Sequence, residues 1–384
     1  MHTQSTFDHP SKAGKTIAMR PAIAHIHLQN LLHNYHILCQ RAEDAQIMAV
    51  VKADAYGHGL KSISQTLQQA GCKHFAVTDA SEGAQLRSYL GKEPSIILLS
   101  GLFESSEVAT CNTYDLTPVI SDEKHIQWLH DQDFTGKVWL KVDTGMQRLG
   151  AEHPEKLMQF CHQHQISLAG MMSHLACADT PEHPLNAVQA NAFYQLHQSI
   201  APHLPASLLN SAGLIALPQH KHDIIRPGIA LYGAEPIPHE PMGLKPVMQL
   251  SGKVMQIRDV EKGTTLSYGA SFIAEKDMTV ALISLGYGDG LPRALSNKGY
   301  AEFQGQHLPI VGRVCMDYCL LNMTNADLEI NDTVTFWGES LPPNTVADLL
   351  DTIPYTLMTG INQRVHRIPI TPQTHPLETS GASG

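Results

Sequence analysis

Residues 47–59 read IMAVVKADAYGHG, a short apolar run followed by a lysine and a glycine-containing turn. The run 47–51 is apolar and rich in β-branched residues, which predicts a strand buried on both faces. Lys52 is then the first charged residue at the carboxyl end of that strand. An amine at the edge of an apolar core is partly desolvated, which favours the neutral, nucleophilic form that can form a Schiff base. For Lys52 taken alone, a structural lysine that reaches solvent is the alternative.

Seven further apolar runs follow, and amphipathic segments separate them. The predicted strands are 47–51, 75–78, 96–100, 117–120, 138–142, 168–172, 207–209 and 223–225. Helical periodicity lies between them, for instance over 80–90, 122–130 and 154–162. Eight strands alternating with helices over roughly two hundred residues predict an α/β fold, a closed (β/α)8 barrel of the TIM type. An open doubly wound sheet is the alternative.

The rest of the chain has a different pattern. A further strand is predicted over 23–28, with helical spacing after it, and the helical period fades after residue 243. Strands divided by Gly, Asn and Asp turns are then predicted over 247–257, 279–285, 308–314, 320–323 and 333–337. We expect a loose arm over 1–16, the barrel over 17–243 and a mostly β C-terminal domain over 244–384. The GYGDG segment at 286–290 lacks the spacing of a dinucleotide-binding loop.

Composition excludes several classes of protein. With 384 residues and 43% hydrophobic content, the chain can bury a large core and form two domains. A net charge of -10 argues against nucleic acid or an anionic membrane as a partner, because both attract basic surfaces. No apolar stretch is long enough to span a bilayer and no secretory signal is recognisable, so we expect a cytoplasmic protein. The seven cysteines form neither a disulfide framework nor a zinc pattern, and we expect no metal.

Chemically capable residues follow several of the predicted barrel strands. In chain order they are Lys52, Tyr56, Asp143, Thr144, Arg148, His174, Asn210, Ser211 and Arg226. Catalytic groups of such barrels lie on the loops after the strands, so these side chains are expected to meet at one end. The loops after the last two strands commonly cradle a phosphate, for which Ser211 and the backbone at Gly228 and Ile229 are placed. A phosphate cradle opposite a Schiff-base lysine predicts pyridoxal phosphate.

Several longer motifs closely resemble those of the bacterial alanine racemases. They are residues 49–59, 141–150, 210–213, 225–233, 267–269, 286–290, 311–317 and 353–355, and they occur in the same order. The resemblance extends from about Ile17 to Arg367. It implies a homodimer that uses pyridoxal phosphate to interconvert L-alanine and D-alanine, which supplies D-alanine for peptidoglycan synthesis. Gln147, Tyr318 and His366 depart from the motifs, outside the residues expected to touch the substrate.

The resemblance implies two bases. Lys52 resembles the lysine that holds the cofactor and then acts on the D-face of the α-carbon, and Tyr268 resembles the base that the partner subunit supplies for the L-face. Racemisation removes a proton from one face and returns it on the other, so it needs two such groups. His174 and Arg226 would tune Tyr268 through hydrogen bonds. Arg226 would also face the pyridine nitrogen, which an arginine does not protonate, and this fits a racemase better than a decarboxylase.

The other matching residues have supporting roles. The phosphate-holding positions are matched by Tyr56, Ser211, Gly228, Ile229 and Tyr355. Arg148 matches the arginine that orients the cofactor and substrate. Met316 matches a residue of the neighbouring subunit whose backbone contacts the substrate carboxylate. Tyr287 matches a tyrosine at the entrance to the site. Asp317 is expected to support Met316. Lys141 matches a lysine that is often carbamylated and then steadies Arg148; a buried lysine paired with a carboxylate is the alternative.

Other functions remain open at this point. A racemase of broader or serine specificity would use the same residues, because a small pocket discriminates by only about 1–3 kcal/mol per methylene. A decarboxylase on a similar barrel and a non-catalytic carrier of pyridoxal phosphate are further alternatives. The carrier would need neither Tyr268 nor the second domain, so their presence favours an enzyme.

Overall fold

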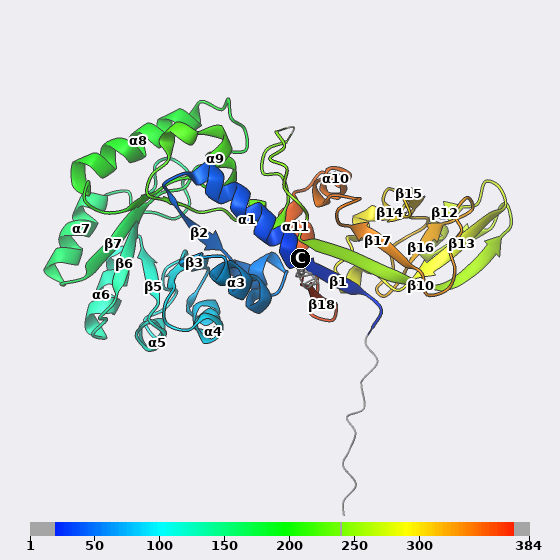
Figure 1. Cartoon of the computed structure of the whole chain (residues 1–384), viewed down its shortest axis with the longest axis horizontal. Coiled ribbons are helices and arrows are strands. Elements are labelled where there is room, and N and C mark those ends of the chain that lie inside the picture. Colours follow the sequence, from blue (N-terminus) through cyan, green and yellow to red (C-terminus); the bar gives the residue numbers. More distant parts are fainter. Residues whose placement is uncertain (1–19, 239, 372–384) are drawn as a thin grey trace, which may run out of the picture.

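The computed structural model describes residues 20–238 and 240–371. The predicted loose arm over residues 1–16 lies outside the described residues. Figure 1 shows an α/β barrel and a β-rich domain lying end to end along the long axis of the molecule. Helix α1 (Leu28–Ala42) starts where the two parts meet and runs back along the barrel.

One eight-stranded sheet forms the barrel, which confirms the predicted fold class. Its strands are β2 (Gln46–Val50), β3 (His74–Val77), β4 (Ser95–Leu98), β5 (Thr117–Ile120), β6 (Lys137–Lys141), β7 (Ser167–Met172), β8 (Ala206–Ser207) and β9 (Ile224–Ile225). Neighbours pair in chain order and in parallel, and β9 pairs with β2. The ring is nearly closed between β8 and β9, where the Arg226 N–H donates to the Leu209 carbonyl at 2.9 Å. The open-sheet alternative is therefore wrong.

Helices alternate with these strands. They are α2 (Lys52–Tyr56), α3 (Leu60–Gln69), α4 (Ala80–Leu90), α5 (Glu107–Tyr114), α6 (Glu123–Asp131), α7 (Pro154–Gln163), α8 (Leu185–Ile200) and α9 (Ser211–Ala216), with short 3-10 turns η1 (Pro218–His220) and η2 (Ile229–Tyr232). Local chemistry sets their ends. Asp79 caps α4 by accepting the N–H groups of Ser81 and Glu82 at 2.9 and 3.0 Å, and Gly91 ends it with a φ of 72°.

The second sheet carries the C-terminal domain, which is mostly β as predicted. Its strands are β10 (Met248–Val260), β13 (Met278–Ile283), β14 (Tyr300–Phe303), β15 (Gln306–Pro309), β16 (Cys319–Asn322), β17 (Thr333–Trp337) and β18 (His366–Ile370), and a small hairpin consists of β11 (Thr265–Leu266) and β12 (Phe272–Ile273). The long strand β10 pairs antiparallel with β13 and β17. Two short helices, α10 (Pro343–Asp348) and α11 (Pro354–Thr359), return toward the barrel (Figure 1).

The first strand, β1 (Ile23–His27), belongs to this second sheet and not to the barrel. It pairs antiparallel with β10 and parallel with β18. The prediction that all of residues 17–243 form the barrel is therefore corrected, because the first strand in this range lies in the second sheet. The physical reason is the alternation of fully buried Ala24 and Ile26 with partly exposed neighbours, which suits a sheet with one covered face. Within 20–238 and 240–371, no helix is long and apolar enough to cross a membrane.

Candidate active site

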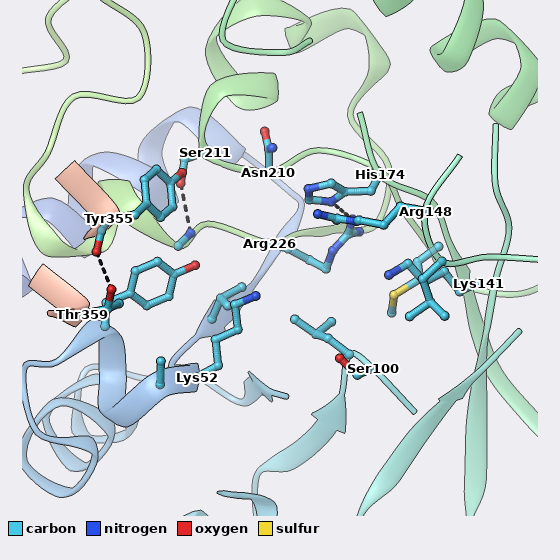
Figure 2. Close-up of a pocket in the computed structure, with 17 residues that line it drawn as sticks. Lys52, Ser100, Lys141, Arg148, His174, Asn210, Ser211, Arg226, Tyr355 and Thr359 are labelled. Atoms are coloured by element: carbon cyan, nitrogen blue, oxygen red, sulfur yellow. Dashed lines mark hydrogen bonds between the residues drawn. The ribbon is translucent and has the colours of Figure 1, made fainter. Parts of the chain in front are cut away.

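A cavity of about 570 Å³ at the carboxyl ends of the barrel strands collects most of the predicted site residues. Those that line it are Lys52, Tyr56, Lys141, Arg148, His174, Ser211, Arg226, Gly228 and Tyr355. Figure 2 shows the amine of Lys52 pointing into the space between Tyr355 on one side and Arg148 on the other. Tyr355 comes from α11, so the second half of the chain closes one wall of the barrel site.

The turn after Lys52 has an unusual backbone. Residues 53–56 all have φ near +50°, and Gly57 follows at +79°, so α2 is one left-handed turn. Left-handed helix costs about 1–2 kcal/mol per residue that carries a Cβ, so the surrounding structure must hold the turn in place. Glu82 does part of this, because its carboxylate accepts the N–H groups of Ala53 and Thr78 at 2.7 and 2.8 Å. Sequence reasoning missed Glu82, which lies thirty positions away on α4 with no local signal.

Cations dominate the cavity. Lys52, Lys141, Arg148 and Arg226 line it, and no carboxylate is found among the described residues of its wall. Burial and the charge of Arg148 lower the pKa of Lys52. Burial and the neighbouring arginines lower the pKa of Lys141 to about 8. This excess of positive charge suits an anionic ligand and favours the neutral form of both amines.

Arg226 and His174 form a fixed pair. The Arg226 guanidinium is buried and donates to the Ser207 hydroxyl at 2.5 Å and to the Leu208 carbonyl at 3.2 Å. It also faces Nδ1 of His174 at 3.4 Å, as the dashed line in Figure 2 marks. Burial and the charge of Arg226 hold the pKa of His174 well below its usual value. The imidazole is therefore neutral, with Nδ1 as the acceptor and the proton on Nε2.

The predicted phosphate cradle lies opposite this pair. Ser211 opens α9, and its hydroxyl receives the N–H groups of Gly228 and Ala230 at 3.0 and 3.3 Å. A Cβ at Gly228 would lie 2.5 Å from the Tyr56 hydroxyl oxygen, so only glycine leaves room for that phenol. The rings of Tyr56 and Tyr355 have centroids 5.7 Å apart, and burial raises the pKa of Tyr355 to about 12. Protonated phenols, a hydroxyl and backbone donors thus converge, which fits a phosphate group.

Two further predicted positions are Ile229, which does not line the cavity, and Arg148, which does. Ile229 is buried as the first residue of η2, directly after Gly228. Arg148 is presented by a loop that Asp143 organises: this carboxylate accepts the N–H groups of Gly145 at 2.7 Å and of Arg148 at 2.9 Å. These hydrogen bonds keep the pKa of Asp143 below its usual value even though burial opposes them. The sequence placed Asp143 after the fifth predicted strand but did not predict this role, and it missed Thr359, which also lines the cavity.

The remaining predicted residues lie in the second domain, away from this cavity. Tyr268 opens a 3-10 turn, η3 (Tyr268–Ala270), and is 72% exposed. Tyr287 in η4 (Tyr287–Asp289) and Met316 are also exposed, and Asp317 pairs with Arg364 at 2.9 Å. A single chain therefore does not bring the predicted second base to Lys52. Exposed tyrosines and a methionine together are typical of a surface that another molecule covers.

Two family models match almost the whole described chain. Residues 26–236 match the alanine racemase N-terminal domain, and residues 247–369 match the alanine racemase C-terminal domain. A catabolic alanine racemase of Agrobacterium fabrum is 38% identical over 366 residues, covering 92% of this chain and 94% of the relative. An alanine racemase of Stutzerimonas stutzeri is 36% identical over 360 residues, covering 91% and 99%.

Solved structures agree with this similarity. The alanine racemase of Acinetobacter baumannii superposes with a TM-score of 0.85 at 32% identity, covering 92% of this chain and 100% of that one. The alanine racemase of Bartonella henselae, solved with covalently bound pyridoxal phosphate, superposes with a TM-score of 0.85 at 34% identity, covering 91% and 99%. At these identities and coverages the likeness includes the barrel, the second domain and the way they are joined.

Proposed function

This chain belongs to the alanine racemase family, and on that basis we propose how its own residues carry out the reaction. The reaction is the interconversion of L-alanine and D-alanine, and the cofactor is pyridoxal phosphate. The observation that carries the proposal is the cavity itself. A lysine of lowered pKa faces a cradle of phosphate donors, in a wall that holds four cations and no carboxylate among its described residues.

The residues present fit the cofactor. Lys52 would hold it through its amine, and its phosphate would be bound by Tyr56, Ser211, Tyr355 and the backbone at Gly228 and Ile229. The room that Gly228 leaves for the Tyr56 phenol is the clearest sign of this fit. When bound, the cofactor withdraws electrons from the substrate α-carbon and so acidifies its proton.

Two groups would move that proton. Lys52 would take or return it on the D-face, because burial and the charge of Arg148 lower its pKa and so favour the neutral amine that accepts a proton. Tyr268 of a second copy would serve the L-face. Burial lowers the pKa of Arg226 to about 10, so this side chain keeps its charge and donates no proton to the cofactor ring. Because the ring nitrogen receives no proton from Arg226, protonation at other carbons is disfavoured and racemisation is the favoured reaction.

The assembly and the cellular role are part of the proposal. Tyr268 and Met316 belong to the second domain, and their side chains are 72% and 52% exposed. They are therefore free to reach the site of another copy, which supports a homodimer with shared active sites. We place the enzyme in the cytoplasm and assign it the supply of D-alanine for peptidoglycan. Its similarity to a catabolic racemase supports alanine breakdown as the second candidate role.

Incubation of the cofactor-loaded protein with pure L-alanine in deuterium oxide tests the activity. We expect D-alanine with deuterium at the α-carbon, measured by chiral chromatography and mass spectrometry. Parallel assays with L-serine and L-lysine test the alternative of a broader or shifted specificity. A higher kcat/KM for serine than for alanine would overturn the choice of substrate, and release of carbon dioxide would reveal a decarboxylase.

Replacement of Gly228 by alanine should weaken cofactor binding. The new Cβ would displace the Tyr56 phenol, whose hydroxyl oxygen is 2.5 Å from that position. Loss of one hydrogen bond to a charged group, worth about 1.5–3 kcal/mol, predicts a dissociation constant roughly 10- to 100-fold higher. Titration of the apoenzyme with pyridoxal phosphate, followed by absorbance, measures this constant. Binding of pyridoxal, which lacks the phosphate, should change little, and an unaltered affinity for both would disprove the cradle.

The matched control for that variant is Gly338→Ala. A Cβ there would lie 3.0 Å from Cγ of Gln249, so the variant also adds a methyl group at a tight position, but outside the cavity. This control separates loss of the cradle from a general cost of adding a methyl group at a glycine.

Carbamylation of Lys141 should depend on pH. Only a neutral amine reacts with carbon dioxide, and burial with nearby Arg226 and Arg148 lowers the pKa of Lys141 to about 8. The reactive fraction therefore rises as pH increases through about 8 and falls below it. Isotope-labelled bicarbonate and carbon NMR should show one carbamate signal that is absent from Lys141→Met. A protein without this signal at pH 9 would instead favour a plain buried lysine.

A further inference from the structure

Arg367 joins the two halves of the molecule at the active site. It lies on β18 in the sheet of the second domain, yet its Nε–H donates to the carbonyl of Gly57 in the barrel at 3.0 Å. Gly57 ends the left-handed turn that starts after Lys52 and includes Tyr56. A Cβ at Gly57 would overlap the Met358 carbonyl, so this turn is also pressed against α11. Arg367 is therefore one of the contacts that hold the strained turn.

The same guanidinium fixes the segment 361–365, which connects α11 to β18. Its other N–H groups donate to the carbonyls of Ile361 and Asn362 at 2.7 Å each and of Val365 at 2.9 Å. One planar group thus holds four carbonyls, including that of Gly57. A lysine ammonium is a point charge on a flexible stem and does not reproduce this fork.

The segment 361–365 in turn holds the loop of Tyr287. The Asn362 N–H donates to the Asp289 carbonyl at 3.0 Å, and Arg364 pairs with the Asp289 carboxylate at 2.7 Å. Asp289 is fully buried and also pairs with Arg20 through two hydrogen bonds of 3.0 Å. Such a carboxylate depends on its partners, because removal of one leaves a buried charge uncompensated.

Met316 belongs to the same unit. Arg364 donates to the Met316 carbonyl at 3.0 Å and pairs with Asp317 at 2.9 Å. The Tyr287 N–H donates to the Cys315 carbonyl at 2.9 Å, and the Gly288 N–H donates to the Met316 carbonyl at 2.8 Å. Hence an unbroken series of hydrogen bonds and ion pairs leads from Gly57, beside the cofactor lysine, to the loops of Tyr287 and Met316.

We propose that Arg367 is a positioning residue for two active sites at once: it fixes the Lys52–Gly57 turn of its own barrel and the Tyr287 and Met316 loops that this chain lends to its partner. The inference rests on the proposed function, in which those loops complete the neighbouring site. A merely structural arginine would lower stability without altering both sites in the folded dimer. Arg367→Met removes the fork and keeps much of the apolar stem, and Arg41→Met, at an exposed position on α1, is the matched control.

Hydrogen exchange measured by mass spectrometry tests the connection without any cofactor. In Arg367→Met we expect faster amide exchange in peptides covering 53–59 and in those covering 286–290 and 315–317, with β5 and β6 unchanged. Arg41→Met should match the parent protein throughout. Faster exchange confined to 361–371 would overturn the inference.

Mixed dimers with one working site test the two effects separately. One chain carries Lys52→Ala, the other carries Tyr268→Ala, and different tags allow purification of the mixed dimer. Its only complete site combines Lys52 of the second chain with Tyr268 of the first. We expect Arg367→Met in either chain to lower kcat/KM at this site about tenfold, because small misplacements near the chemistry have large effects. Arg367→Met should also speed the release of pyridoxal phosphate, but only when it is in the chain that carries Lys52. The absorbance of the cofactor measures this release.

The outcomes are distinguishable. If Arg367→Met in the Tyr268-donating chain leaves kcat/KM at the value of the Arg41→Met control, the inference is wrong and the proposed function stands. If the mixed dimer without Arg367→Met is inactive while the wild-type enzyme racemises alanine, the shared site is wrong and the inference falls with it.

Discussion

Replacement of Lys52 by alanine is expected to lower kcat for alanine racemisation by about 10⁴-fold or more, the largest effect of any single change in the chain. The lysine has two tasks, to hold the cofactor and to move the proton on the D-face, and a positioned acid or base alone contributes about 10²–10⁴-fold. Chiral chromatography of alanine measures the loss, and absorbance of the protein-bound cofactor reports the missing covalent link.

Two further variants define what Lys52 supplies. Lys52→Arg keeps a positive charge but offers no neutral amine, because a guanidinium stays protonated, so it should be as inactive as Lys52→Ala. Lys61→Ala removes an exposed lysine of α3 and should leave the rate unchanged. Residual activity above a few per cent in Lys52→Ala would indicate a substitute base, and Lys141, with its pKa of about 8 in the same cavity, would be the first to examine.

The barrel could be predicted from the sequence because its pattern is local. Each predicted strand overlaps an observed one, since continuous apolar runs such as β3 are buried on both faces of a parallel sheet. Catalytic groups of such barrels lie on the loops after the strands, so the chemically capable residues were predicted to meet at one end, and the cavity contains them there. Where the signal depends on partners far along the chain, prediction failed. Strand β1 precedes the barrel in sequence but pairs with β10 and β18.

The backbone conformation of the turn after Lys52 was also not predictable from the local sequence. Ala53 and Ala55 carry a Cβ and so avoid a positive φ, and one aspartate between them does not predict a whole left-handed turn. The conformation follows from tertiary contacts, which include Glu82 on the Ala53 N–H and Arg367 on the Gly57 carbonyl. The network around Asp289 was also not predicted, because its arginines come from the two ends of the described chain. Residues that act through other residues leave no periodic pattern in a single sequence.

Replacement of Tyr268 by phenylalanine should lower racemisation about 10²–10⁴-fold, because one of the two proton-transfer groups is lost. The variant should nevertheless exchange the α-proton of D-alanine with deuterium oxide, since Lys52 still removes and returns that proton on the D-face. L-alanine should exchange far more slowly. Proton NMR of each isomer measures these rates. Equal loss of exchange for both isomers would mean that Tyr268 is not a base for one face.

Mixing two inactive chains tests where that tyrosine acts. Tyr268 is 72% exposed in the second domain and the barrel cavity of its own chain lacks it, so each site should use the tyrosine of the other chain. Random pairing of Lys52→Ala with Tyr268→Phe chains gives mixed dimers for about half of the population, each with one of its two symmetric sites intact, so about a quarter of wild-type activity should return. If both residues acted within one chain, no mixture would regain activity. Recovery therefore distinguishes a shared site from a site closed by its own chain.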